Sequence, residues 1–134
     1  MAYRLQKKRL LIAIGLWVGL TLFLSLQPAS SVRLLVRSSL LVSLAHIPVY
    51  GVMAFLSCLY LRFRRSLGNW RMKDPHVMVI SFLVVSGFGV VNEGLQVLAA
   101  GRICDLFDIQ CNIIGAAGGS LFFYLFRQWG FLRR

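Results

Sequence analysis

Four long apolar segments constrain the fold of this chain more than any other feature of its sequence. They cover residues 10–26, 40–61, 77–100 and 109–126, and a helix needs about 20 predominantly apolar residues to cross a bilayer. Of the 134 residues, 58% are hydrophobic and only 14% are charged, which is far from the balance of a soluble domain. The sequence therefore predicts an all-α integral membrane protein, a single-domain bundle of four transmembrane helices joined by short loops.

The first apolar segment has a competing interpretation as a secretory signal peptide, because the basic run Lys7-Lys8-Arg9 precedes it. Its apolar run is longer than a normal signal-peptide core, and the sequence QPASS that follows is a poor cleavage site. We therefore expect the segment to be retained as the first spanning helix.

Basic residues are distributed unevenly among the connections, and this predicts the orientation. Twelve of the 15 lysines and arginines lie before the first span, between the second and third, or after the fourth. They are Arg4, Lys7, Lys8, Arg9, Arg62, Arg64, Arg65, Arg71, Lys73, Arg127, Arg133 and Arg134. The other two connections contain only Arg33, Arg37 and Arg102. Because short basic loops stay in the cytoplasm, we expect both termini inside, as in a multi-pass protein of a bacterial inner membrane.

The formal charge of +11 raises the alternative of a nucleic-acid partner. Nucleic-acid binding needs basic residues spread over a folded soluble surface, whereas here they flank apolar runs. Positive charge so placed contacts anionic membrane lipids, so we expect lipid partners and no nucleic acid.

Polar residues of three predicted helices reach a common depth near the outer surface. At 1.5 Å per residue, His46 lies roughly 9 Å below the outer start of its helix, and Glu93 lies roughly 24 Å above the inner start of its own. Asn112 lies one turn into the last helix. Helical spacing also gives each helix one polar face. The three pairs that share a face are His46 with Tyr50, Glu93 with Gln96, and Asp108 with Asn112.

A structural role explains most of these residues when each is taken alone. Asp108 is a candidate N-terminal cap, Arg102 a candidate partner for Asp105, and the amides are candidate interhelical hydrogen-bonding groups. Glu93 differs, because an ionisable residue inside a membrane is expensive and marks a functional site by default. Together the polar faces predict a cleft that opens on the outer side.

Small residues also recur at helix-packing spacing. Gly115-x-x-x-Gly119 in the fourth span and Gly15-x-x-x-Gly19 in the first both suit close helix contact. They support a packed bundle and indicate nothing specific about function.

Several short motifs connect the polar residues. They are Glu93-x-x-Gln96, Gly101-Arg102 and Asp108-x-x-x-Asn112-x-x-Gly115, preceded by His46 in LAHIPVYG and by SLQPAS after the first span. This pattern, over residues 25–119, resembles the VanZ-like family of small membrane proteins, whose founder is associated with resistance to the glycopeptide teicoplanin. Family members often carry an Asp-Lys pair where this chain has Val42 and Ser43, which indicates an altered role or a different subgroup.

Two functions remain open at this stage. In the first, an enzyme modifies an envelope lipid: Glu93 is a general base or metal ligand, His46 a proton-transfer partner, Asp108 a second acid or ligand, and Arg102 a phosphate clamp. Magnesium or calcium held by the carboxylates would bridge to the phosphate. The remaining candidates for ligand binding are Tyr50, Gln96, Asp105 and Asn112.

In the second, the same cleft binds a lipid-linked cell-wall precursor or a glycopeptide without chemistry, which fits the resistance association of the family. A small transporter is a third and weaker possibility, because the inner halves of the predicted helices are nearly all apolar.

Overall fold

A computed structural model describes residues 2–35, 38–66 and 73–129 of the chain. Within those ranges it contains five helices and no strand. The helices are α1 (Ala2–Ser25), α2 (Ala29–Leu35), α3 (Ser39–Ser66), α4 (Asp74–Gln96) and α5 (Leu106–Gln128). All except α2 are long and apolar enough to cross a membrane. The prediction of an all-α protein with four potential spanning helices is confirmed.

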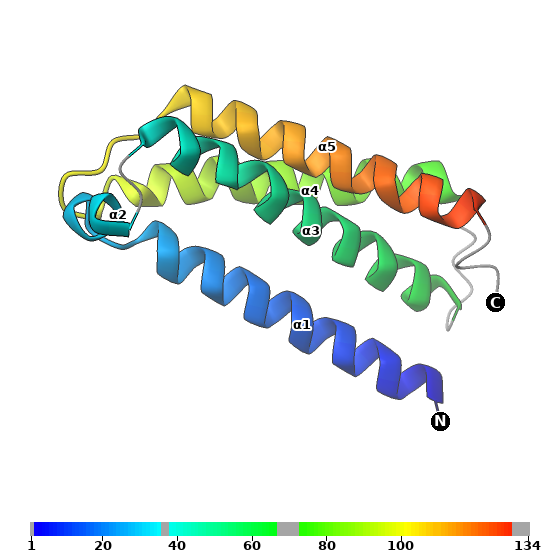
Figure 1. Cartoon of the computed structure of the whole chain (residues 1–134). Helices are drawn as coiled ribbons and strands as arrows, with labels where there is room; N and C mark the ends of the chain where they lie inside the picture. The colour runs from blue at the N-terminus through cyan, green and yellow to red at the C-terminus, as the bar shows by residue number, and fades with distance from the viewer. Residues whose placement is uncertain (1, 36–37, 67–72, 130–134) are drawn as a thin grey trace.

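The start of α1 and the end of α5 lie at the same end of the molecule, and α2 and the α4–α5 connection lie at the opposite end (Figure 1). We call these the terminal end and the α2 end. Most of the basic residues counted above belong to the terminal end. Four of the counted arginines, Arg37, Arg71, Arg133 and Arg134, lie outside the described residues.

The helices at the terminal end are longer than the apolar segments that predicted them. α1 already begins at Ala2, and α3 continues to Ser66 through the basic stretch after residue 61. Lysine and arginine are good helix formers, so the backbone remains helical where the apolar run has ended. Apolar length marks the part of a helix that crosses the membrane, and the helix itself ends elsewhere.

At the α2 end, α4 ends four residues before the limit of the third apolar segment, and α5 begins three residues before the fourth. α4 ends at Gln96 rather than residue 100, because two tighter backbone bonds follow, Leu98 N to Leu95 O (3.0 Å) and Ala99 N to Gln96 O (2.9 Å). Gly101 then turns the chain with a φ of 72°, a conformation that glycine adopts without strain.

The start of α5 is set by Asp105, whose side chain accepts a hydrogen bond from Phe107 N at 2.8 Å. This is N-capping, which satisfies a backbone donor that has no partner inside the helix. Asp108 lies one turn further along, inside the helix. The alternative in which Asp108 caps this helix is therefore wrong.

The short helix α2 was not predicted. It follows Pro28, and Ser31 N donates to Pro28 O at 3.0 Å to close its first turn. Ala29 N donates to Ala100 O at 3.1 Å, which ties the start of α2 to the α4–α5 connection. These two bonds close the α2 end around the site described below.

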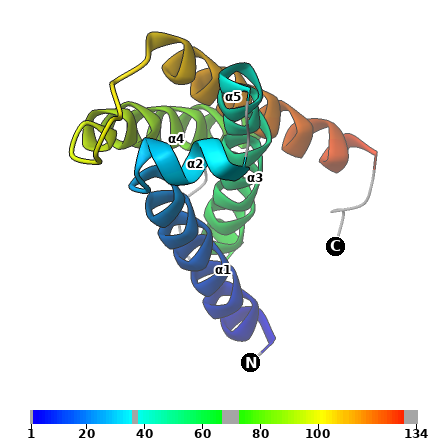
Figure 2. The same cartoon turned by 60° about the vertical axis from the view of Figure 1, so that its left-hand side comes forward.

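α3 and α5 cross closely along glycines (Figure 2). A Cβ at Gly115 would overlap the backbone of Ile47, and a Cβ at Gly119 would overlap the carbonyl group of Gly51. The predicted role of this pair in tight packing is confirmed. Gly15 and Gly19 differ, because a Cβ at either position would meet nothing within 4 Å.

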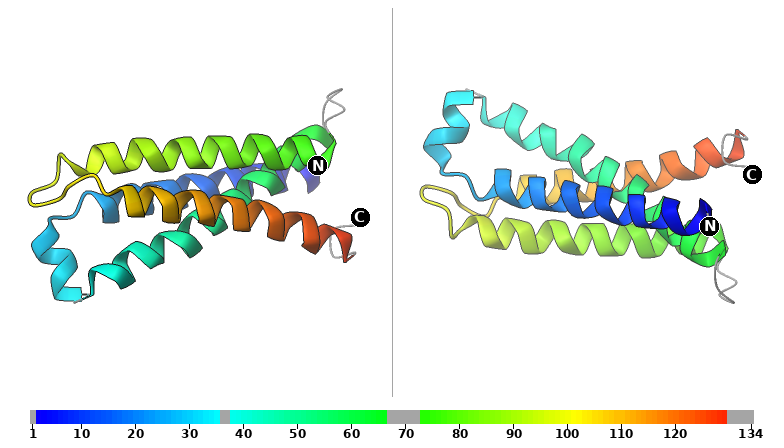
Figure 3. Two further views of the ribbon diagram at one scale, coloured as in Figure 1. Left: turned by 90° about the horizontal axis from the view of Figure 1, so that it is seen from above. Right: turned by 90° about the horizontal axis from the view of Figure 1, so that it is seen from below.

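α1 packs less tightly and lies along α3 and α4 (Figure 3). Its indole donor, Trp17 Nε1, bonds to the carbonyl oxygen of Val49 in α3 at 2.9 Å. Much of its apolar surface is exposed, as at Leu16, which is 70% exposed. Lipid is the solvent that such a surface requires. The four apolar helices and this surface indicate a multi-pass membrane protein.

Toward the terminal end, the core is apolar and closed. Cys58, Val77 and Phe123, from three different helices, are fully buried against one another. The hydroxyl group of Ser81 donates to the carbonyl oxygen of Ala54 at 2.9 Å. An ion pair between Asp74 and Arg127 joins the start of α4 to the end of α5.

Candidate functional site

Three helices bring ionisable side chains together near the α2 end. His46 comes from α3, Glu93 from the last turn of α4, and Asp108 from the first turn of α5. One ligating atom of each lies within 4.8 Å of the others. Glu93 is fully buried and Asp108 is 8% exposed. The predicted convergence of these residues is confirmed, and the roles assigned to them stay predictions.

A chain of hydrogen bonds connects the site to the α4–α5 connection. Arg102 donates to the Gln96 side-chain oxygen, and Gln96 Nε2 donates to Glu93 Oε1 at 2.6 Å. Glu93 Oε1 in turn lies 3.6 Å from His46 Nδ1. The two candidate ligand-binding residues Gln96 and Arg102 therefore hold one oxygen of Glu93 in place.

Asn112 fixes the histidine. His46 Nδ1 lies 2.8 Å from Asn112 Oδ1, and because an amide oxygen only accepts, the ring nitrogen carries the proton and donates. In the neutral ring the lone pair then lies on Nε2. Tyr50, which is 1% exposed, stacks on the His46 ring with centroids 6.1 Å apart and an interplanar angle of 14°. The imidazole is thus held by contacts from two helices.

Gly89 makes this convergence possible. A Cβ at residue 89 would lie 2.9 Å from Asn112 Cβ and 3.0 Å from the Tyr50 ring. Asn112 Nδ2 also approaches the Gly89 carbonyl oxygen, at 3.5 Å. A larger residue would push α5 and Tyr50 away from α4 and open the site.

Two carboxylate oxygens in the site have no hydrogen-bond partner within the described residues. They are Glu93 Oε2 and Asp108 Oδ1, and both are inaccessible to solvent. A buried polar atom without a partner loses its hydration and gains nothing in exchange. Each of these oxygens is therefore free to accept a hydrogen bond or to bind a cation.

Asp105 and Arg102 each bind a different group, whereas the sequence had offered them as partners of each other. Asp105 is exposed and caps α5, whereas the guanidinium of Arg102 bonds to Gln96. Both side chains line a polar cavity of about 480 Å³ at the α2 end. Asp108, Val42 and Ser43 line the same cavity. Val42 and Ser43 thus border the site.

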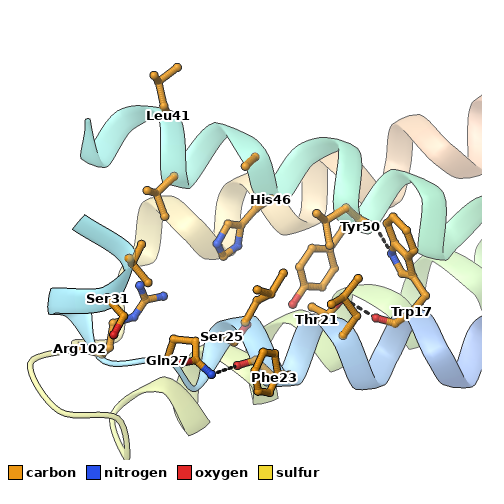
Figure 4. Close-up of a pocket in the computed structure, with 16 residues that line it drawn as sticks. Trp17, Thr21, Phe23, Ser25, Gln27, Ser31, Leu41, His46, Tyr50 and Arg102 are labelled. Carbon is orange, nitrogen blue, oxygen red and sulfur yellow. Dashed lines mark hydrogen bonds between the residues drawn. The ribbon is translucent and has the colours of Figure 1, made fainter. Parts of the chain in front are cut away.

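An apolar cavity of about 540 Å³ adjoins the polar one, between α1 and α3. Figure 4 shows His46 and Tyr50 reaching from α3 into the space next to α1, with Arg102 beside Ser31 at the end nearest α2. The apolar wall of this cavity includes Trp17, Leu20, Leu24, Val42, Ala45 and Val49. Arg102, Val32 and Val42 line both cavities. Cavities of this size accommodate small molecules.

One polar stripe was missed in the sequence. Trp17, Thr21 and Ser25 line the apolar cavity from α1, and Ser25 Oγ accepts a hydrogen bond from Asn92 Nδ2 at 2.9 Å. The spacing of four residues places all three on one helix face. That spacing was the available signal for a polar face on the first helix, although it does not identify the helix that this face meets.

The fold and the site place this chain among multi-pass α-helical membrane proteins that hold a buried polar cluster near one end of the bundle. The chain matches no protein-family model, no curated protein and no solved structure. The chemistry available to the cluster is therefore judged from its groups. It offers carboxylates and an imidazole for proton transfer or ion binding, and a guanidinium for binding an anion.

Proposed function

We propose that this chain is a VanZ-like protein of the bacterial inner membrane, with cytoplasmic termini and a site on the outer side that binds a phosphate-bearing lipid. The observation that carries this proposal is the meeting of an apolar and a polar cavity at Arg102. A lipid has an apolar tail and a polar head group, so it needs both kinds of cavity side by side.

The position of the apolar cavity favours a lipid tail that enters the cavity from the membrane. It lies between α1 and α3, along the part of both helices that is apolar enough to span a bilayer. Among the helix pairs that contact each other, α1 and α3 pack less extensively than α3 and α5. A tail therefore reaches the site by moving between two helices, without leaving the hydrocarbon.

The position of Arg102 favours a lipid whose head group carries a phosphate. Its guanidinium lies at the junction of the cavities, where a head group must sit if the tail occupies the apolar side. Guanidinium groups bind phosphate through paired hydrogen bonds, which gives both strength and orientation. The lipid class that fits is a phospholipid or a polyprenyl phosphate, including a lipid-linked cell-wall precursor.

A transporter fits less well. A polar path would have to continue through the bundle, whereas the described terminal half is filled by the cluster of Cys58, Val77 and Phe123. The described polar cluster is confined to the α2 end.

Lipid binding is tested with the purified chain in nanodiscs. Photoreactive phosphatidylglycerol and a photoreactive polyprenyl diphosphate are compared with photoreactive diacylglycerol, which has no phosphate. We expect the two phosphate-bearing lipids to label residues of the apolar cavity. Ala45→Trp, which fills that cavity, removes the labelling, and Arg102→Ala reduces it for the phosphate-bearing lipids.

Two matched variants serve as controls. Ala117→Trp places the same bulk on an exposed part of α5 that lines neither cavity, and Arg64→Ala removes an exposed arginine at the terminal end. Both controls should label as the wild type does. Equal labelling by all three lipids, or equal loss in the controls, would contradict the proposal.

Chemistry on the bound lipid is tested in the same preparation with radiolabelled lipids. If Glu93 is a general base, Glu93→Gln binds the lipid but forms no product. Absence of product from the wild type in the presence of each of several divalent metals would leave the binding function and remove the enzymatic one. The VanZ-like resemblance adds an expectation for cells: the chain raises teicoplanin tolerance, and Glu93→Gln abolishes the effect.

A further inference from the structure

We infer that His46, Glu93 and Asp108 form a binding site for one divalent transition-metal ion, for which Zn²⁺ and Mn²⁺ are the candidates. The three side chains come from three helices and present their ligating atoms within 4.8 Å of one another. Donors around a single zinc ion lie roughly 3–4 Å apart, given metal–ligand distances of about 2.0–2.2 Å. Binding of an ion would draw the three donors closer together than the 4.8 Å within which they lie.

The two buried oxygens without partners provide independent support. Glu93 Oε2 and Asp108 Oδ1 have no hydrogen bond within the described residues, although Glu93 is fully buried and Asp108 is 8% exposed. Glu93 Oε1 is already occupied by Gln96. Each carboxylate thus keeps one buried oxygen that is available to a cation.

Charge balance leads to the same conclusion. Glu93 and Asp108 place two carboxylates close together inside the bundle, and Arg102, the nearest described arginine in the site, bonds to Gln96. Burying unpaired charge is costly, and a bound metal is one of the few ways to compensate it. A divalent ion neutralises both carboxylates at once.

The surroundings of the ligands match those of metal sites. A ligating histidine usually donates its second ring N–H to an oxygen acceptor, which orients the ring. Here His46 donates from Nδ1 to Asn112 Oδ1 at 2.8 Å, which leaves the Nε2 lone pair available. Gln96 orients Glu93 in the same way, through its 2.6 Å hydrogen bond.

The mixed donor set distinguishes between metals. Magnesium and calcium prefer oxygen ligands alone, whereas one imidazole with two carboxylates suits a first-row transition metal. The magnesium or calcium ion expected from the carboxylates alone is therefore the weaker candidate once His46 joins them.

The ion would also link the site to the lipid. His46 lines the apolar cavity and Asp108 lines the polar one, so the metal would lie where the two meet. Asp105 and Asp108 make the polar cavity unfavourable for a phosphate, and a divalent ion reverses that effect. This second step rests on the proposed function, whereas binding of the ion itself does not.

The test measures the metal alone. Purified full-length chain in detergent is stripped with a chelator, dialysed against Zn²⁺ or Mn²⁺ without any lipid ligand, and analysed for metal content. We expect one ion per chain for at least one of these metals, with weaker retention of Mg²⁺. Glu93→Gln, Asp108→Asn and His46→Ala should each reduce affinity by at least about tenfold.

His76→Ala is the matched control, because His76 is exposed at the start of α4 and should leave metal binding unchanged. A rise of the thermal midpoint of the wild type on adding the ion, reversed by chelator, checks binding without any variant. Less than half an ion per wild-type chain, or full binding by Glu93→Gln and Asp108→Asn, would overturn the inference. Metal binding without lipid labelling would refute only the proposed function.

Discussion

The two halves of the bundle are built from the same helices but differ in what fills them. Glycines let α3 and α5 touch from Ile47, which is next to the polar site, to Gly51 near the middle of the bundle, whereas in the terminal half Cys58, Val77 and Phe123 pack in an apolar cluster. In the half near α2, the same helices enclose a histidine, two carboxylates and three amides, and two cavities remain. The terminal half is filled by apolar side chains, and the half near α2 leaves polar groups available for a ligand.

This difference indicates that close packing contributes more to holding the bundle together than the polar residues do. Close packing along glycines supplies that stability in membranes, where the hydrophobic effect does not drive helices together. Buried carboxylate oxygens without partners lower stability, so their presence near α2 has to be explained by function. Substitutions in the two halves should therefore have opposite consequences.

The largest loss of stability is expected from Gly119→Val. A Cβ at residue 119 overlaps the carbonyl group of Gly51, so α3 and α5 must separate. Overpacking of this kind costs about 3 kcal/mol at the upper end of its usual range. Reversible unfolding in mixed micelles measures the change. Gly118→Val is the matched control, since a Cβ there meets nothing within 4 Å. Equal losses of stability in both variants would refute the role of Gly119 in the close packing of α3 and α5.

A smaller loss is expected from Ser81→Ala. The fully buried hydroxyl of Ser81 donates to the carbonyl oxygen of Ala54, and such interhelical bonds contribute about 0.6 kcal/mol in membrane proteins. Ser86→Ala provides the comparison on the same helix, because the buried Ser86 hydroxyl has no partner within the described residues. Its removal should leave the free energy of unfolding unchanged or higher. A larger loss in the free energy of unfolding for Ser86→Ala than for Ser81→Ala would contradict this account.

The smallest cost is expected from Asp108→Asn in the presence of chelator. The amide keeps the size of the side chain and removes a charge that has no partner at Oδ1, so the free energy of unfolding should stay the same or rise. The same unfolding experiment measures it. A loss above about 1 kcal/mol, the size of an average destabilising substitution, would show that Asp108 serves packing.

The spans and the convergence of the polar faces were predictable from the sequence because both follow from the number of residues along each helix. Apolar length identifies four helices, and a rise of 1.5 Å per residue sets the depths of His46 and Glu93. Helix ends depend on local bonds instead. Asp105 and Asp108 both suit an N-cap, and only the backbone geometry identifies Asp105 as the residue that caps α5.

Helix partners were not predictable from spacing. Gly15-x-x-x-Gly19 and Gly115-x-x-x-Gly119 look alike in the sequence, yet only the second pair meets another backbone. The apolar cavity was missed for the same reason, because it exists only where α1 and α3 diverge. A sequence states which face of a helix is polar or small, and the arrangement of neighbouring helices decides what that face meets.

The central claim is that the polar site lies at the outer surface of the membrane, and Cys104 tests it directly. This cysteine is exposed in the connection beside the site, whereas Cys58 and Cys111 are buried. In intact cells, a membrane-impermeant maleimide should label the wild-type chain, and Cys104→Ser should remove the label. Labelling that appears only after the membrane is permeabilised would place the site on the cytoplasmic side and contradict the account.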